Sequence, residues 1–146
     1  MIPVYQTSLR PPLGNCMQAC VASLFEEDLD TVPPFVEWQG PLAWWDEIRR
    51  FVRSWGPIDI GCIDNIKAYL EVDWSNTDPA WRYAIASVPS VNGPWNHAVI
   101  VDDHNLVVHD PYPGSDVWTG KQAEAKEWWV LVDEQYTWPT PVGEFS

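Results

Sequence analysis

The sequence predicts one α+β domain, with N-terminal helices packed on a mostly antiparallel sheet. As far as Trp55, apolar residues recur at the three-to-four-residue spacing of helices. After Pro79 the apolar segments are short, rich in β-branched and aromatic residues, and bounded by turn residues. Helices followed by strands is the order of an α+β layer fold. The length of 146 residues is that of a single domain, so we assign residues 1–146 to one unit.

The first helix is expected over residues 15–26. Asn15 is a favourable N-cap and Gln18 follows three residues later, as in a capping box, so Cys16 opens the helix. The apolar spacing predicts a second helix over residues 42–55, which Gly56 and the proline after it end. The pattern also predicts a strand over residues 58–62 and a short helix over residues 66–70.

The strands expected after Pro79 cover residues 82–88, 97–101, 106–109 and 128–132. Two tryptophan pairs, Trp44-Trp45 and Trp128-Trp129, are each expected to bury one ring and expose the other, because neighbouring side chains in a chain segment face different directions. Residues 133–146 contain two prolines and are expected to form an extended tail.

Composition limits the classes of function. The chain has 8 basic and 21 acidic residues, a net charge of −13, which disfavours binding to nucleic acid or to anionic membranes and favours neutral or basic partners such as basic peptides. No apolar stretch approaches the length of a membrane span, and no basic flank precedes an apolar run at the N-terminus. Three cysteines, an odd number without paired spacing, indicate a reducing compartment; we expect a cytoplasmic protein.

A predicted hairpin brings a histidine and an aspartate together. Residues 102–105 carry turn chemistry between two apolar runs. If Val101 faces Leu106, His97 lies directly opposite Asp110, with Cβ atoms roughly 4.5–5.5 Å apart on one face of the sheet. A carboxylate at that distance can orient an imidazole, while the adjacent His109 must point to the other face.

Cys16 supplies the nucleophile that such a histidine and aspartate would activate. At a helix N-terminus the unpaired amides and the helix dipole favour thiolate over thiol, and an imidazolium nearby favours it further. The same amides can stabilise an oxyanion. A second oxyanion donor is expected from a side chain upstream, with Gln6 as the first candidate and Asn15, which the cap requires, as the second.

Three blocks of the sequence, in this order, resemble papain-like cysteine peptidases, and within them the small stand-alone proteins of the bacteriocin-processing-peptidase-like group found in bacteria and bacteriophages. They are Gly14-Asn15-Cys16-Met17-Gln18-Ala19-Cys20, His97-Ala98-Val99-Ile100-Val101 and His109-Asp110-Pro111. The resemblance implies a papain-like fold, a Cys16 nucleophile, a His97 general base and acid, an orienting Asp110, a Gln6 oxyanion donor and no cofactor.

The chain departs from this pattern at the oxyanion glutamine. In papain-like enzymes that residue usually lies closer to the cysteine, at the position of Arg10 here, whereas Gln6 precedes Cys16 by ten residues. Bacteriocin-processing relatives are also commonly fused to a transporter and cut leader peptides at a double glycine. Nothing in this sequence supplies a transporter, so that substrate class is not carried over.

Other interpretations stay open beside the peptidase. Cys20 and Cys62 are expected in the core. Asp110 and His97 could serve only as a turn residue and an edge-strand side chain. Zinc held by Cys16, Cys20 and a histidine is disfavoured, because no second ligand pair has the required spacing, and no metal is expected.

The substrate expected for a hydrolase is a peptide or protein, and Trp95, Asn96 and Tyr112 flank the histidine and aspartate as candidate cleft residues. Peptidase, deamidase and transglutaminase chemistry would use the same three side chains. The alternative from a different class is a non-enzymatic module that binds or sequesters a peptide or protein through a tryptophan-lined groove.

Overall fold

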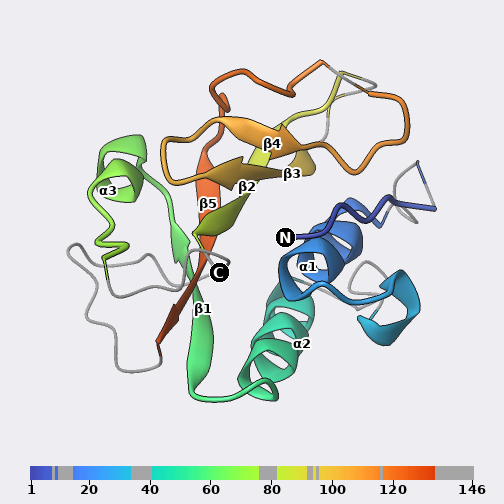
Figure 1. Cartoon of the computed structure of the whole chain (residues 1–146), viewed down its shortest axis with the longest axis vertical. Helices are drawn as coiled ribbons and strands as arrows, with labels where there is room; N and C mark the ends of the chain where they lie inside the picture. The colour runs from blue at the N-terminus through green and yellow to red at the C-terminus, as the bar shows by residue number, and fades with distance from the viewer. Residues whose placement is uncertain are drawn as a thin grey trace.

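The computed structural model describes residues 1–7, 9, 15–33, 41–75, 82–91, 94, 96–115 and 117–133, with the main chain alone for residues 41–45 and 133. Helices and strands alternate little: helices come first and strands dominate the second half, as Figure 1 shows. The elements in chain order are α1 (Cys16–Phe25), the 3-10 turn η1 (Leu29–Thr31), α2 (Pro41–Arg53), β1 (Ile58–Ile63), α3 (Ile66–Leu70), β2 (Tyr83–Pro89), β3 (Asn96–Asp102), β4 (Val107–His109) and β5 (Glu127–Asp133).

These elements confirm the predicted α+β class. Each predicted helix and strand is present, with ends within two residues of those expected. The five strands form one sheet in the order β1-β5-β2-β3-β4, and every neighbouring pair is antiparallel. The tail predicted beyond residue 133 lies outside the described residues. The helices in the described part of the chain are all too short or too polar to span a lipid bilayer.

Helices cover both faces of the sheet. In Figure 1, α1 and α2 lie on one side of the sheet and α3 lies on the other. Alternate residues of each strand therefore enter two separate cores: Ile85 and Ile100 pack with α1 and α2, whereas Ala86 and Val99 pack in the core that includes Tyr69 of α3.

This arrangement corrects one prediction about the tryptophans. Trp128 and Trp129 are both buried, at 1% and 4% exposure, and neither ring of the pair faces solvent. Strand β5 lies inside the sheet, between β1 and β2, and helices cover both of its faces. Alternate residues of the strand therefore enter two different cores, and neither set of side chains faces solvent. The side chains of Trp44 and Trp45 lie outside the described ones.

Candidate active site

Helix α1 begins at Cys16, and its N-terminal end meets the start of β3. The carbonyl oxygen of Asn15 accepts the Ala19 amide at 3.0 Å, which fixes Asn15 as the residue before the first turn. The helix packs against β2 and β3, so the thiol of Cys16 reaches the strand that carries His97. Cys16 is partly exposed, unlike Cys20 and Cys62, which are buried. The residue predicted as the nucleophile is therefore the least buried of the three cysteines.

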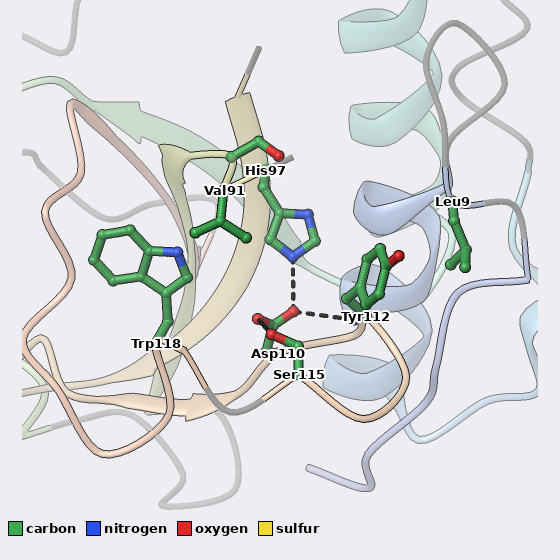
Figure 2. A pocket seen from close by; sticks show the side chains of 8 residues that line it. Leu9, Val91, His97, Asp110, Tyr112, Ser115 and Trp118 are labelled. Atoms are coloured by element: carbon green, nitrogen blue, oxygen red, sulfur yellow. Dashed lines mark hydrogen bonds and ion pairs between the residues drawn. The ribbon is translucent and has the colours of Figure 1, made fainter. Parts of the chain in front are cut away.

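His97 and Asp110 are joined by a short hydrogen bond, drawn as a dashed line in Figure 2. Nε2 of His97 lies 2.7 Å from Oδ1 of Asp110, and the exposed fractions of the two side chains are 13% and 2%. Asp110 Oδ1 also accepts the Tyr112 amide at 3.0 Å, and Oδ2 accepts the Ser115 hydroxyl at 3.0 Å. Both carboxylate oxygens are thus occupied by donors.

The register that predicted this contact is wrong, although the contact is present. Val101 pairs with Val107, one residue beyond the expected Leu106, and a bulge before it makes Ile100 pair with His109, two residues beyond. A shift of one residue would have turned Asp110 to the opposite face from His97, whereas a shift of two restores the face. Strand β4 ends at His109, so Asp110 meets His97 from the loop that follows rather than from a paired strand position.

His109 faces the other way, as predicted. Its ring is buried, and Nε2 donates to the carbonyl oxygen of Val4 at 2.8 Å, with Tyr5 packed edge-on at a ring-centroid distance of 5.0 Å. His109 therefore helps to hold the N-terminal segment against the sheet and takes no part in the contact between His97 and Asp110.

The thiol and the imidazole shift each other's ionisation. Burial raises the pKa of Cys16, but hydrogen bonding and charge attraction from His97, with the amides of Ala98 and Met17, outweigh it and hold the pKa below its ordinary value. Burial lowers the pKa of His97, yet the hydrogen bonds and charges of Asp110 and Cys16 raise it to about 9. At neutral pH this favours a thiolate beside an imidazolium.

Nδ1 is the ring nitrogen of His97 that remains for Cys16, because Nε2 is bonded to Asp110. In Figure 2 this second nitrogen points toward the side on which α1 lies. The pKa of Asp110 itself is raised by burial but lowered further by His97, the Tyr112 amide and the Ser115 hydroxyl, so the carboxylate stays ionised. The three groups thus form a line of alternating charge from sulfur to carboxylate.

The other two thiols belong to the core, as predicted. Cys20 is 0% exposed and burial raises its pKa well above the ordinary value, while burial raises the pKa of Cys62 to about 12. Both are therefore protonated at neutral pH. Cys16 differs from them through its partner, His97, and not through its residue type.

Gln6 lies between the two segments that carry the nucleophile and the carboxylate. It is buried, at 5% exposure, and its backbone amide donates to the carbonyl oxygen of Pro111 at 2.9 Å. The next residue, Thr7, is joined twice to Asn15: its amide donates to Asn15 Oδ1 at 3.0 Å, and Asn15 Nδ2 donates to its hydroxyl at 3.1 Å. Because Thr7 is held at Asn15, Gln6 lies close to the start of α1 despite the ten-residue separation in sequence.

The predicted capping box is wrong. The side chain of Asn15 makes no cap hydrogen bond and holds Thr7 instead. Gln18, the expected partner in the box, donates to the carbonyl oxygens of Leu29 at 3.0 Å and Val32 at 2.8 Å. Both polar side chains of this turn connect α1 to other segments, because long-range partners compete successfully with the local cap.

A shallow pocket opens over the histidine and the aspartate. It encloses about 350 Å³, counting the part open to solvent, and in Figure 2 Val91 and Trp118 lie on one side of His97 with Leu9 on the other. Its wall consists of Leu9, Ser90, Val91, His97, Asp110, Tyr112, Ser115 and Trp118.

Sequence reasoning found only part of this wall. Tyr112 lines the pocket as predicted. Asn96 is the exposed first residue of β3, and Trp95 lies outside the described residues. Leu9, Val91 and Trp118 were not foreseen, because they come from three separate loops that no spacing in the sequence connects. Ser115 is also absent from the predicted site, although it lies only five residues after Asp110, whose Oδ2 accepts its hydroxyl.

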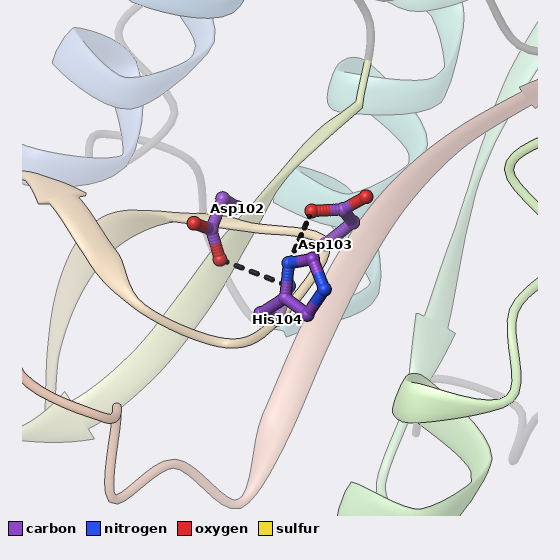
Figure 3. Close-up of side chains that lie close together, drawn as sticks. All are labelled: Asp102, Asp103 and His104. Atoms are coloured by element: carbon purple, nitrogen blue, oxygen red, sulfur yellow. Dashed lines mark hydrogen bonds and ion pairs between the residues drawn. The ribbon is translucent and has the colours of Figure 1, made fainter.

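Within the described residues, one cluster of titratable side chains could offer three ligand atoms to a cation: Asp102, Asp103 and His104, drawn in Figure 3. Their contacts are those of a hairpin turn. Asp102 Oδ1 accepts the amides of His104 and Leu106, each at 2.9 Å, and His104 Nδ1 lies 2.9 Å from Asp103 Oδ1. The His104 side chain is 79% exposed, in agreement with the solvated turn predicted from the sequence.

Comparison of the chain with known proteins adds no relative. A scan against protein families, a search of curated proteins and a search of solved structures each find no match.

Proposed function

We propose that this chain is a papain-like cysteine hydrolase that cuts a peptide or other amide bond through a thioester on Cys16. The single observation that carries the proposal is the arrangement of Cys16, His97 and Asp110. The thiol at a helix N-terminus has a lowered pKa because it interacts with His97, which is held at 2.7 Å by a buried carboxylate. Nucleophile, base and orienting acid are the three parts that covalent acyl transfer requires.

In the acylation step the Cys16 thiolate attacks the carbonyl carbon of the amide. As the tetrahedral intermediate collapses, the carbon–nitrogen bond breaks and the imidazolium of His97 gives its proton to the leaving amine. A thioester and a neutral imidazole remain. The oxyanion would be stabilised by the Cys16 backbone amide, which has no acceptor within the helix, and by the side-chain amide of Gln6.

In the second step water hydrolyses the thioester. Neutral His97 takes a proton from water as its oxygen attacks the acyl carbon, the carbon–sulfur bond breaks, and the thiolate–imidazolium pair is restored. Asp110 accepts from Nε2 throughout, so Nδ1 stays directed at the reacting atoms. The same acyl-enzyme would give a deamidase if the leaving amine were ammonia, or a transglutaminase if an amine replaced water.

The walls of the pocket favour uncharged substrate side chains next to the scissile bond. Leu9, Val91 and Trp118 are apolar, and the carboxylate in the wall, Asp110, is already bonded to three donors. A preference for basic peptides therefore rests on the net charge of −13 and would act by long-range attraction.

The first test asks whether Cys16 is a reactive thiolate. A brief exposure to iodoacetamide at pH 7, followed by peptide mapping, should place the adduct on Cys16 and not on Cys20 or Cys62. His97→Ala should remove this selectivity, and Cys62→Ala, which deletes a thiol outside the site, should preserve it. Equal, slow labelling of all three cysteines in the folded protein would contradict the proposal.

The second test asks for turnover. The protein is incubated with a mixed peptide pool in water enriched in heavy oxygen, and products are analysed by mass spectrometry. Cleaved peptides with heavy oxygen at the new carboxyl group indicate a peptidase. Heavy oxygen on a glutamine side chain indicates a deamidase, and a new amide to an added amine indicates transfer. Each product should disappear with Cys16→Ala. If a biological effect of the chain survives Cys16→Ala, the protein acts as a binder instead.

A further inference from the structure

A short loop encloses the carboxylate of Asp110 from the side opposite His97. The backbone turns back at Gly114, and the Ser115 amide donates to the carbonyl oxygen of Tyr112 at 3.1 Å. Gly114 has a φ of +76°, in the left-handed region that side chains rarely adopt, so glycine lets the turn close here. The turn delivers the Ser115 hydroxyl to Oδ2 of Asp110 at 3.0 Å.

The two oxygens of Asp110 therefore have separate tasks. Oδ1 receives Nε2 of His97 at 2.7 Å and the Tyr112 amide at 3.0 Å, whereas Oδ2 receives the Ser115 hydroxyl. A carboxylate held at one oxygen can still rotate about its Cβ–Cγ bond, because this torsion is broad. A donor on the second oxygen fixes the plane of the group, and with it the direction in which Oδ1 faces.

We propose that Ser115 is a positioning residue of the site, which holds the plane of the Asp110 carboxylate so that His97 stays directed at Cys16. This proposal rests on the proposed function of the site. A neutral hydroxyl suits the task, because it satisfies the buried oxygen while leaving the full negative charge of Asp110 to attract the imidazolium. A cation at the same place would compete with His97 for that charge.

Because Asp110 is buried, its carboxylate depends on the Ser115 hydroxyl for a hydrogen bond at Oδ2. The Asp110 side chain is 2% exposed, so the oxygen facing Ser115 has little access to replacement water. Hydrogen bonds to charged groups are stronger than neutral ones, and a buried charged acceptor that loses its donor bears a large desolvation cost. Loss of the hydroxyl should therefore loosen the orientation of His97 and weaken its stabilisation of the Cys16 thiolate.

The test measures the pH dependence of Cys16 alkylation by iodoacetamide, with mass spectrometry to assign the adduct. In the wild type the rate should reach half its plateau at a pH below the ordinary range of a thiol. In Ser115→Ala this midpoint should move up by about one pH unit, so that Cys16 reacts about tenfold more slowly on the rising limb. Ser115→Thr, which keeps the hydroxyl, should restore the midpoint.

Ser54→Ala is the matched control, because it removes a hydroxyl that bonds the Phe51 carbonyl at 2.6 Å on α2, away from the site. Its midpoint should equal that of the wild type. A Ser115→Ala midpoint equal to that of the wild type, or equal shifts in Ser115→Ala and Ser115→Thr, would overturn the role of the hydroxyl. A wild-type midpoint in the ordinary thiol range would instead overturn the proposed function, so the two failures are distinguishable.

Discussion

Asp110 Oδ1 and His97 Nε2 lie 2.7 Å apart, in a contact from which solvent is almost excluded. The contact decides which ring nitrogen is left for the thiol. With Nε2 engaged, Nδ1 is the atom able to exchange a proton with Cys16 or with a leaving amine. The carboxylate therefore sets the orientation of the base as well as its charge, and the two effects can be separated by substitution.

Asp110→Asn should keep the shape of the side chain and remove its charge. We expect acylation to slow by about 10²–10⁴-fold, the range of general acid–base catalysis, because the amide no longer stabilises the imidazolium that donates to the leaving group. The measurement is kcat/KM for an amide substrate found in the peptide screen. His109→Asn, at the neighbouring imidazole that faces Val4, controls for general effects on the sheet. A fall of equal size in His109→Asn would remove the special role of Asp110.

The pH profile of acylation should be broad and displaced in opposite directions at its two ends. The reactive form is a Cys16 thiolate beside protonated His97. The pKa of Cys16 lies below its ordinary value, so activity should rise at a pH lower than that of a free thiol. The raised pKa of His97, about 9, keeps the ring protonated as pH increases, so activity should fall only as pH passes about 9.

The same profile in Asp110→Asn should narrow from its alkaline end. Without the carboxylate, the pKa of His97 should fall toward the ordinary value of roughly 6.5, and the upper limb should move down with it. The measurement is kcat/KM between pH 4 and pH 10 for both proteins. An alkaline limb at the same pH in both would mean that another group controls it.

Gln6→Ala should separate hydrolysis from simple alkylation. An oxyanion forms when Cys16 attacks an amide, but none forms when it displaces iodide from iodoacetamide. Loss of one oxyanion donor costs about 10²–10³-fold in kcat. We therefore expect that loss for peptide hydrolysis, with the alkylation rate unchanged. The backbone bond from Gln6 to Pro111 survives the substitution, so the segment should stay in place.

Gln122→Ala, at an exposed glutamine on the strand-connecting loop, is the control for Gln6→Ala. It should leave both rates as they are. If Gln6→Ala slows alkylation as much as hydrolysis, the residue supports the fold of the site and is not an oxyanion donor.

The contact between His97 and Asp110 could be predicted from the sequence because it depends on the parity of the register. Alternation along two neighbouring strands assigns each residue to a face, and a two-residue error keeps the assignment. No glycine in β3 or β4 marks the register shift between Ile100 and Val101, so the strand residues carry no local signal for it. The predicted register was wrong, but it paired His97 with Asp110, and these two side chains are in contact in the structure.

Residues whose partners are distant in sequence were predicted less well. Asn15 and Gln18 fit a local capping box, yet their side chains bond Thr7 and the carbonyls after α1, contacts that exist only once the segments have packed. The exposure of Trp128 and Trp129 likewise depends on whether helices cover one face of the sheet or two. Local patterns define elements; the pairing of separate segments decides what each polar or aromatic side chain contacts.

Trp118→Ala should weaken the binding of substrates with an apolar side chain beside the scissile bond. The indole lines the pocket on the side of His97 where Val91 lies, and its loss removes an apolar wall. We expect a fall of about tenfold in kcat/KM for a peptide with leucine at the responsive position, equivalent to roughly half of the free energy of burying such a side chain. The fall should appear mainly in KM, with alkylation by the small iodoacetamide unchanged.

Trp55→Ala, at a 44% exposed tryptophan just after α2, removes the same group far from the pocket and should leave both rates unaltered. A peptide with lysine in place of leucine gives the second comparison. If the pocket selects apolar groups, Trp118→Ala should reduce the difference between the two peptides. An unchanged ratio of their kcat/KM values would mean that this wall does not contact the substrate, because a side chain in contact with Trp118 must sense its loss.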